Sequence, residues 1–215
     1  MQAEFWQQCW QQQRIGFHQT EVHPLLPVLT QQLQLSSSVS TFVPLCGKSL
    51  DMLWWRQFGS VVGAELSELA CQQFFLEAGF AASCQSQGAH QLYSAEQISL
   101  WQGDYFALES SQLGPVGLIY DRAALIALPD AMRTLYVEKL KHLCPAASLL
   151  LLTLDYPAAE MQGPPFAIPD HDVHALFRFA QSVELLAVRD LTGRPFAQRQ
   201  FKVSRLIERA YLIRW

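Results

Sequence analysis

The chain has 215 residues, half of them hydrophobic and 16% charged, which is enough apolar material for one large core and shows no disorder signature. Its net charge of −4 argues against nucleic acid as the main partner, because binding nucleic acid depends on a basic surface. The longest apolar stretch, residues 146–154, is too short to span a bilayer. We therefore expect a single domain over residues 1–215 that binds neither nucleic acid nor a membrane.

The cysteines and the N-terminal sequence bear on the compartment. The five cysteines are scattered, odd in number and never spaced as C-x-x-C, so we predict neither a disulfide framework nor a zinc site. His171 and His174 have helical spacing but no third ligand, so no metal is expected there either. The first residues lack a basic segment followed by an apolar one, so no secretory signal is read. A cytoplasmic protein is expected.

The first predicted elements are helical. Residues 4–13 form a glutamine-rich helix with aromatic side chains on neighbouring turns, and residues 23–35 form a second helix interrupted near its prolines. The polar residues 36–40 then lead into the first strand. No helix shows an exposed apolar stripe that demands a partner, so we expect a monomer.

From residue 41 onwards, strands and helices alternate. We expect strands at residues 41–45, 61–65, 98–102, 116–120 and 149–155, and helices at residues 48–58, 68–78, 130–143 and 170–179. This alternation predicts a parallel sheet covered on both faces. The last two strands, 183–189 and 205–213, have no helix between them and form an antiparallel hairpin. The predicted fold is α/β, with a doubly wound, mostly parallel seven-stranded sheet that ends in this hairpin.

Residues 41–67 carry the strongest functional signal. An apolar run meets Gly47, a helical segment follows, and the next apolar run ends on Glu65, 18 residues after the glycine. A glycine turn admits the part of a ligand that lies against the backbone, and an acid near this spacing accepts the ribose hydroxyls of a nucleoside. A plain strand-to-helix turn is the rival interpretation, and Glu65 favours the ligand site.

Two commoner nucleotide motifs are excluded here. The segment 46–49 reads Cys-Gly-Lys-Ser, as a phosphate-binding loop ends, but Phe42 stands where that loop needs its first glycine. The dinucleotide fingerprint G-x-G-x-x-G is also absent, which disfavours nicotinamide and flavin cofactors.

Further candidates follow the next two strands. Asp104 and Tyr105 come after the third strand and could bind an adenine, although Asp104 could equally cap the following turn. Asp121 and Arg122 end the fourth strand as a charged pair among apolar residues, which serves either a ligand or a structural ion pair. Ligands of open α/β sheets bind outside the carboxyl ends of the strands. The residues after the third and fourth strands therefore indicate one site together with Gly47 and Glu65.

Residues 1–36 are expected to cover that site. Phe17 and His18 lie outside the sheet in this helical segment, where they could belong to a lid. His18 could act as a base, or it could be an ordinary surface or hydrogen-bonded histidine.

Several motifs together resemble one family. They are WQQCW (residues 6–10), RIGFHQ (14–19), FVPLCGKSLDMLW (42–54), VVGAELSE (61–68), GDYF (103–106), YDRAALIALP (120–129) and GPPF (163–166). The chain resembles the bacterial thiopurine S-methyltransferases, which have the class I S-adenosylmethionine-dependent methyltransferase fold. The departures are mild: Ala64 stands where valine is expected, and Tyr105 where phenylalanine is common.

The resemblance implies a role for each candidate. The cofactor S-adenosylmethionine would be contacted by Trp10, Leu45, Gly47, Glu65, Asp104, Tyr105 and Arg122. Within this set Glu65 takes the ribose, and Asp104 and Tyr105 lie near the adenine. Trp6 belongs to the segment that covers the cofactor. Phe17 lines the acceptor pocket, and Arg199 lies near the thiopurine.

The implied reaction is an in-line transfer of the sulfonium methyl group to a small-molecule thiol. Such a transfer needs alignment and exclusion of water more than a strong base, because an aromatic thiol already ionises. Arg122 and Arg199 would steady the negative charge of the acceptor, and Asp121 is a candidate proton acceptor. On this basis Arg122→Ala should weaken methylation and leave the fold intact.

Two alternatives stay open. The acceptor could be a small selenium or tellurium compound, in a detoxification reaction associated with bacterial members of this family. The chain could instead be a non-catalytic sensor that binds S-adenosylmethionine without turnover, although a sensor that acts on DNA needs a basic patch that this sequence lacks.

Overall fold

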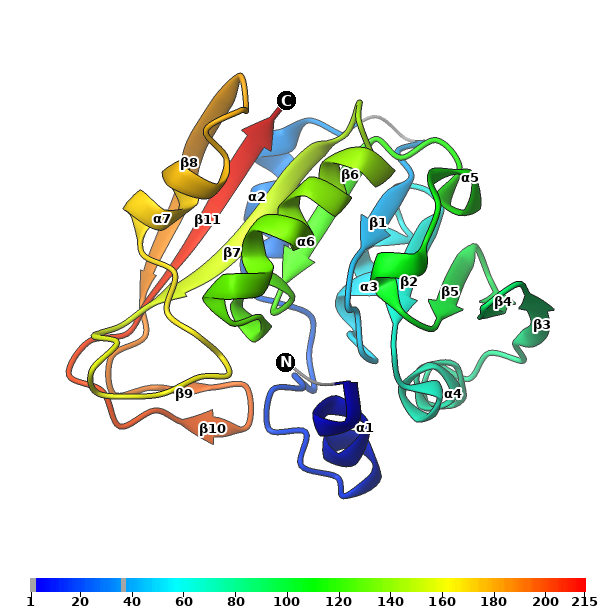
Figure 1. Ribbon diagram of the computed structural model, residues 1–215, viewed down its shortest axis with the longest axis horizontal. Coiled ribbons are helices and arrows are strands. Elements are labelled where there is room, and N and C mark those ends of the chain that lie inside the picture. Colours follow the sequence, from blue (N-terminus) through cyan, green and yellow to red (C-terminus); the bar gives the residue numbers. More distant parts are fainter. Residues whose placement is uncertain (1–2, 36–37) are drawn as a thin grey trace.

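The computed structural model describes residues 3–35 and 38–215, and within them the chain folds around a nine-stranded sheet (Figure 1). The strand order is β3-β4-β5-β2-β1-β6-β7-β11-β8. The strands are β1 (Thr41–Val43), β2 (Val61–Glu65), β3 (Ser83–Gln87), β4 (His90–Ala95), β5 (Ile98–Gln102), β6 (Leu118–Arg122), β7 (Ser148–Asp155), β8 (Ser182–Asp190) and β11 (Ile207–Arg214). A separate short hairpin pairs β9 (Pro195–Phe196) with β10 (Arg199–Gln200).

The predicted α/β fold is confirmed. β5, β2, β1, β6 and β7 pair in parallel, and β11 lies antiparallel between β7 and β8, as the predicted C-terminal hairpin requires. The predicted number of seven strands is wrong, because β3 and β4 extend the sheet beyond β5 as a second antiparallel hairpin. Every residue of β3 is exposed and the strand is rich in serine and glutamine, so it has no apolar alternation to reveal it.

The predicted helices occur in the predicted order, but several are shorter than predicted and α5 was not predicted. The helices are α1 (Ala3–Gln11), α2 (Leu26–Leu33), α3 (Asp51–Trp55), α4 (Glu68–Glu77), α5 (Ser110–Leu113), α6 (Asp130–Leu143) and α7 (Asp170–Leu176). α6 has its predicted bounds, whereas α3 begins three residues later than predicted. Leu45 and Gly47 both have a positive φ, of 46° and 54°, so the chain after β1 runs through turns before a helix can start. Residues 36 and 37 of the predicted polar entry lie outside the described residues.

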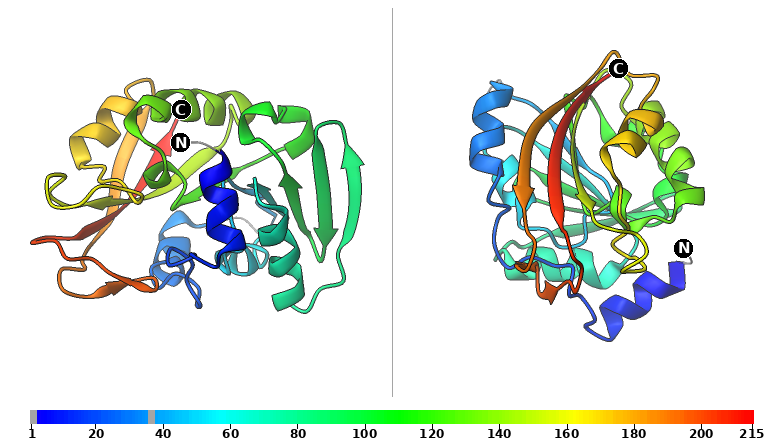
Figure 2. Two further views of the ribbon diagram at one scale, coloured as in Figure 1. Left: turned by 60° about the horizontal axis from the view of Figure 1, so that its bottom comes forward. Right: turned by 90° about the vertical axis from the view of Figure 1, so that its left-hand side faces the viewer.

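The helices form two layers, one on each face of the sheet (Figure 2). Buried side chains of α2, α3 and α4 belong to one apolar cluster, and those of α5, α6 and α7 belong to the other. Successive strand residues alternate between them: Leu118 and Tyr120 of β6 belong to the first cluster, and Ile119 belongs to the second. None of the helices in the described part of the chain is long and apolar enough to cross a membrane.

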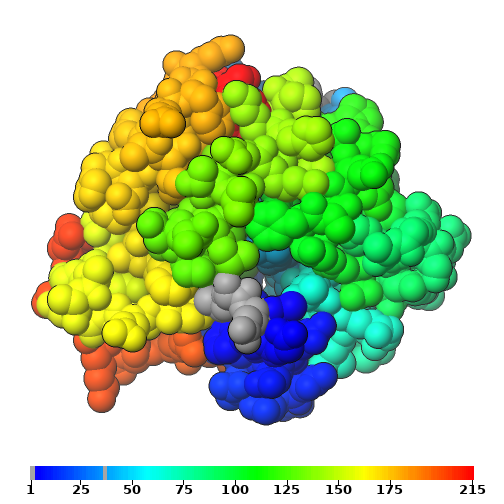
Figure 3. Space-filling view, in the orientation of Figure 1, coloured from blue at the N-terminus to red at the C-terminus, as the bar shows by residue number. Residues whose placement is uncertain are grey.

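The carboxyl ends of the parallel strands meet at the edge of the sheet that faces α1 (Figure 1). In the space-filling view the N-terminal segment, in blue, packs against this edge beside the cyan and green parts of the chain (Figure 3). This is the edge where open α/β sheets bind ligands.

Candidate active site

A cavity of about 450 Å³ lies at this edge, between the strand ends and α1. Nine of the ten predicted site residues line it: Trp10, Phe17, Leu45, Gly47, Glu65, Asp104, Tyr105, Arg122 and Arg199. Asp121 is not among the lining residues. A volume in this range is typical of small-molecule sites.

Glu65, at the end of β2, is buried and holds the turn after β1. Its Oε2 accepts the backbone N–H of Gly47 at 2.8 Å, and its Oε1 accepts that of Ser67 at 2.7 Å. Burial raises the pKa of Glu65, and these hydrogen bonds oppose the rise. Each carboxylate oxygen has two lone pairs, so each can accept one further hydrogen bond from a ligand in the cavity.

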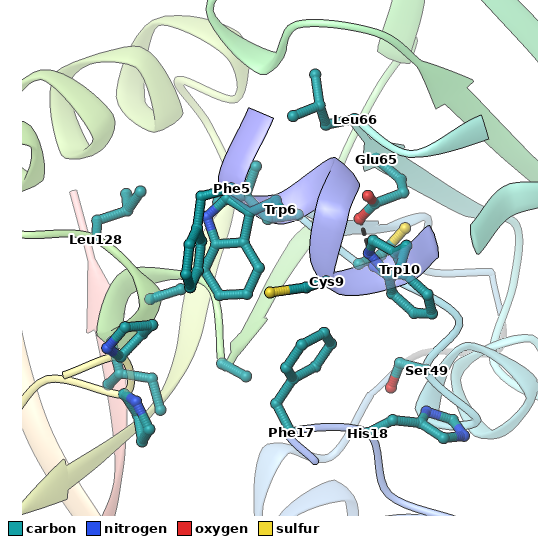
Figure 4. Close-up of a pocket in the computed structure, with 18 of the residues that line it drawn as sticks. Phe5, Trp6, Cys9, Trp10, Phe17, His18, Ser49, Glu65, Leu66 and Leu128 are labelled. Atoms are coloured by element: carbon teal, nitrogen blue, oxygen red, sulfur yellow. Dashed lines mark hydrogen bonds between the residues drawn. The ribbon is translucent and has the colours of Figure 1, made fainter. Parts of the chain in front are cut away.

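Gly47 brings the backbone close to the aromatic ring of Trp10. A Cβ added at Gly47 would lie 3.1 Å from Cζ2 of Trp10, and its φ of +54° is one that glycine adopts without strain. Trp10 itself is buried and comes from α1, so the indole closes the cavity over the turn (Figure 4).

We expect Gly47→Ala to weaken cofactor binding by roughly tenfold or more, because its methyl group crowds the space between the turn and Trp10. The matched control is Gly79→Ala, which has a φ of +73° but nothing within 4 Å of the added methyl group. Both variants should lose a similar amount of stability in urea unfolding, and only Gly47→Ala should lose affinity for S-adenosylhomocysteine in calorimetry. Equal affinity in the two variants would contradict the close approach.

The sequence left two interpretations open for Asp104 and Tyr105, a ligand site and a cap of the following turn. The positions of the two residues are compatible with both. Oδ1 of Asp104 accepts the N–H of Phe106 at 2.9 Å, so the aspartate does cap the following turn. Both residues also line the cavity. Tyr105 is 3% exposed and its hydroxyl donates to the carbonyl of Tyr136, whereas Phe106 presents an exposed ring beside it. The sequence analysis did not single out Phe106, although it lies within the GDYF motif.

Arg122 lines the cavity from the end of β6 and makes its ion pair with a distant residue. Its Nε donates to Oδ2 of Asp51 at 2.6 Å, and its Nη2 donates to Oγ of Ser49 at 2.7 Å. The Arg122 side chain is 7% exposed and that of Asp51 is fully buried. Arg122 therefore belongs both to a structural ion pair and to the cavity wall.

Asp121 points to the opposite face of the sheet from Arg122. Its carboxylate accepts the N–H groups of Ala124 and Leu125 and the hydroxyl of Tyr136 at 2.7 Å. Burial raises the pKa of Asp121 to about 6. Because it lies outside the cavity lining and all its donors come from the protein, its position favours a structural role over proton transfer.

We expect Asp121→Asn to keep methyl-transfer activity within about twofold and to flatten the pH dependence of stability. The folded-state pKa of Asp121, about 6, lies above the ordinary 3.8, so the native state holds the proton more tightly than the unfolded chain. The contribution of this proton binding to the free energy of unfolding is therefore fully present below pH 3.8 and is lost as the pH rises towards 6. Thermal unfolding between pH 4 and 7 measures this, and a large loss of turnover in a folded variant would return Asp121 to the mechanism.

Aromatic side chains of the N-terminal segment form one wall of the cavity (Figure 4). Phe17 makes edge contacts with Trp6 and Trp10, at centroid distances of 5.5 and 5.6 Å. Cys9, which the sequence analysis did not assign to the site, is buried beside these rings. An apolar aromatic wall favours a planar or cationic ligand.

Arg199, at the start of β10, also lines the cavity. Its side chain lies over Gly16, where an added Cβ would be 2.9 Å from Nε, and its Nη1 donates to the carbonyl of Pro164 at 3.3 Å. The N–H of Gln198 donates to the carbonyl of Gly16. The β9–β10 hairpin therefore ties the N-terminal segment to the loop that contains GPPF.

His18 lines the cavity, half-buried, next to Lys48. Burial, together with the positive charges of Lys48 and Arg122, lowers the pKa of His18, which favours the neutral imidazole. Lys48 does not point to a phosphate group, because its Nζ pairs with Glu77 at 2.6 Å.

The surrounding fold is that of S-adenosylmethionine-dependent methyltransferases. A methyltransferase of this class from Anabaena variabilis superposes with a TM-score of 0.68 at 16% identity, covering 99% of this chain and 94% of the other. The 1,6-didemethyltoxoflavin-N1-methyltransferase of Burkholderia thailandensis, solved with S-adenosylhomocysteine, gives 0.64 at 11% identity, covering 99% of this chain and 87% of the other.

Sequence comparison defines the family. The family model for thiopurine S-methyltransferase (TPMT) matches residues 1–215, so the chain belongs to this family. Thiopurine S-methyltransferases of Pseudomonas fluorescens Pf0-1 and Methylococcus capsulatus Bath are 43% and 46% identical to it. Both alignments cover 100% of this chain, and they cover 99% and 98% of the two relatives.

Proposed function

We propose that the protein methylates the sulfur of thiopurines and other aromatic or heterocyclic thiols, with S-adenosylmethionine as the methyl donor. The observation that carries this proposal is the continuity of the cavity, whose lining includes the Glu65–Gly47 turn together with Phe17 and Arg199. A nucleoside-type ligand and an aromatic acceptor can therefore occupy one continuous cavity. Family membership supports the same reaction.

The part of the cavity around the Glu65–Gly47 turn fits the cofactor. Glu65 keeps lone pairs for two ribose hydroxyls, and Gly47 leaves room under Trp10 that any side chain would fill. We assign cofactor binding to the predicted set Trp10, Leu45, Gly47, Glu65, Asp104, Tyr105 and Arg122. The N-terminal segment would cover the bound cofactor through Trp6 and Trp10.

The part of the cavity lined by Phe17 and Arg199 fits an aromatic acceptor that carries negative charge. Phe17 offers an aromatic surface and Arg199 a guanidinium, and Arg122 lies on the same cavity wall as the turn. When bound, the cofactor supplies an electrophilic methyl group on its sulfonium sulfur. The protein contributes exclusion of water by the aromatic wall and stabilisation of the thiolate by Arg122 and Arg199. No side chain has to remove a proton from a thiol that is already ionised at pH 7.

We also propose a cytoplasmic location and a monomeric state. All five cysteines are free, which fits a reducing compartment. The net charge of −4 and the cavity of about 450 Å³ fit a low-molecular-weight acceptor better than a nucleic acid.

The test has two stages. Calorimetry with S-adenosylhomocysteine should show binding, and mass spectrometry should then detect the methylated product of 6-mercaptopurine and of thiophenol. Selenite- and tellurite-derived anions form the comparison panel. Turnover of these anions without turnover of either thiol would contradict the proposed acceptor, and cofactor binding without any methylated product would indicate a sensor.

A further inference from the structure

Asp51 is a fully buried carboxylate beneath the cavity, and two separate parts of the chain, β6 and the segment before α2, converge on it. Its Oδ2 accepts Nε of Arg122 at 2.6 Å and the hydroxyl of Tyr120 at 3.0 Å. Its Oδ1 accepts the backbone N–H of His23 at 2.8 Å. Asp51 is 0% exposed and does not line the cavity, so it can act on a ligand only through these partners.

The contacts of Arg122 leave one end of its guanidinium open. Nε is held by Asp51 and Nη2 by Ser49, while Nη1 has no partner among the residues that the structure describes. A guanidinium is planar, so two fixed nitrogens also determine the direction of the third. The open nitrogen belongs to a side chain that lines the cavity.

Ser49 provides the second hold and a further donor. Its Oγ accepts from Nη2 of Arg122 at 2.7 Å and from the backbone N–H of Asp51 at 3.3 Å. A hydroxyl has two acceptor positions and one proton, so the proton of Ser49 is left to donate elsewhere. Ser49 also lines the cavity. In the Cys-Gly-Lys-Ser segment, the serine therefore holds an arginine instead of a phosphate.

We propose that Asp51 is a positioning residue for methyl transfer: with Ser49, it holds the Arg122 guanidinium so that Nη1 and the Ser49 hydroxyl face the anionic group of the bound ligands. This inference rests on the proposed function. Without the carboxylate, Arg122 can rotate about its side-chain bonds, and the productive orientation becomes one of several. The hydrogen bond from His23 ties the same carboxylate to the segment that precedes α2.

The first test is a double-mutant cycle on kcat/KM for 6-mercaptopurine. Asp51→Asn should lower kcat/KM by about 100-fold, mainly through kcat, because a small misplacement of a charge-stabilising group has effects of this size. In an Arg122→Lys background, which has no guanidinium to orient, the same change should cost less than about threefold. Losses that multiply in the double variant would overturn the proposal, because a general loss of structure adds to any other defect.

The matched control is Asp155→Asn. Asp155 is another buried carboxylate, paired with Arg209 at 2.7 Å on β7 and β11, and it is outside the cavity lining. It should lose stability and keep its kcat. If Asp51→Asn fails to fold, Ser49→Ala removes the other hold on Arg122. It should lower kcat about tenfold in the wild-type background and clearly less in Arg122→Lys, where only the donor of Ser49 itself is lost.

A crystal structure of Asp51→Asn separates this inference from the proposed function. The Arg122 guanidinium should leave Ser49, whichever acceptor the enzyme uses. An unmoved guanidinium would overturn the positioning role even if thiols are methylated. A displaced guanidinium in a protein that methylates no thiol would support the positioning role and contradict the proposed acceptor.

Discussion

Replacing Arg122 by alanine is expected to lower kcat/KM for a thiopurine by about 100- to 1,000-fold, the usual cost of removing a group that stabilises developing or bound negative charge. The structure adds a second effect that the sequence did not predict. Asp51, which is 0% exposed, would be left as a buried carboxylate without its cation. Breaking such a pair costs about 3–5 kcal/mol, so the free energy of unfolding should fall by this amount. The expectation that Arg122→Ala leaves the fold intact is therefore extended by an expected loss of stability.

The two effects can be separated with a second substitution. Arg122→Ala combined with Asp51→Asn removes the uncompensated charge, and its asparagine can still accept from His23 and donate to Tyr120. Urea unfolding should show a large recovery of stability, while turnover stays low. Recovery of turnover along with stability would show that Arg122 acts only on the fold. Arg214→Ala is the control, because its exposed pair with Glu184 should contribute less than about 1 kcal/mol.

Replacing Glu65 by glutamine is expected to weaken S-adenosylhomocysteine binding by about 100-fold, or about 3 kcal/mol. One carboxylate oxygen becomes an amide donor, and it then faces the N–H of either Gly47 or Ser67. The variant therefore loses both an acceptor for the ribose and a hold on the glycine turn. Calorimetry measures the affinity, and urea unfolding without ligand measures the accompanying loss of stability.

Glu68→Gln is the matched control for Glu65. Glu68 is exposed at the start of α4, three residues further on, and does not line the cavity. Its substitution should leave the affinity unchanged. Because burial raises the pKa of Glu65, wild-type affinity should also fall as the pH is lowered, whereas Glu65→Gln should show little of this dependence. An unchanged affinity in Glu65→Gln would remove this residue from the cofactor site.

Much of the cavity lining at the sheet edge could be predicted, because its residues lie at the ends of strands that the apolar pattern reveals. The separation of 18 residues between Gly47 and Glu65 corresponds to one strand–helix–strand unit, and parallel pairing of β1 with β2 brings the two together. The resemblance to the family predicted Phe17 and Arg199 as acceptor residues, and both line the cavity although they are 182 positions apart in the chain. No local pattern would have joined them.

The β3–β4 hairpin was missed for a different reason. β3 is exposed along its whole length, so its stability comes from the backbone ladder with β4 and not from an apolar face. Apolar alternation reports burial of side chains and is silent about a strand of this kind. The Gly88 turn between two short polar runs was the one local signal available.

The sequence by itself determined the alternating strands and helices of the parallel part of the sheet and the residues at its carboxyl edge, because hydrophobic periodicity and turn residues are local properties. Only the tertiary structure decided which side chains bond to the charged residues at this edge. Asp121 and Arg122 are neighbours, yet successive strand residues point to opposite faces of the sheet. Asp121 therefore bonds to Tyr136 of α6, and Arg122 pairs with Asp51 of α3, which is 71 residues away. These partners are determined by the packing of α6 on one face of the sheet and α3 on the other.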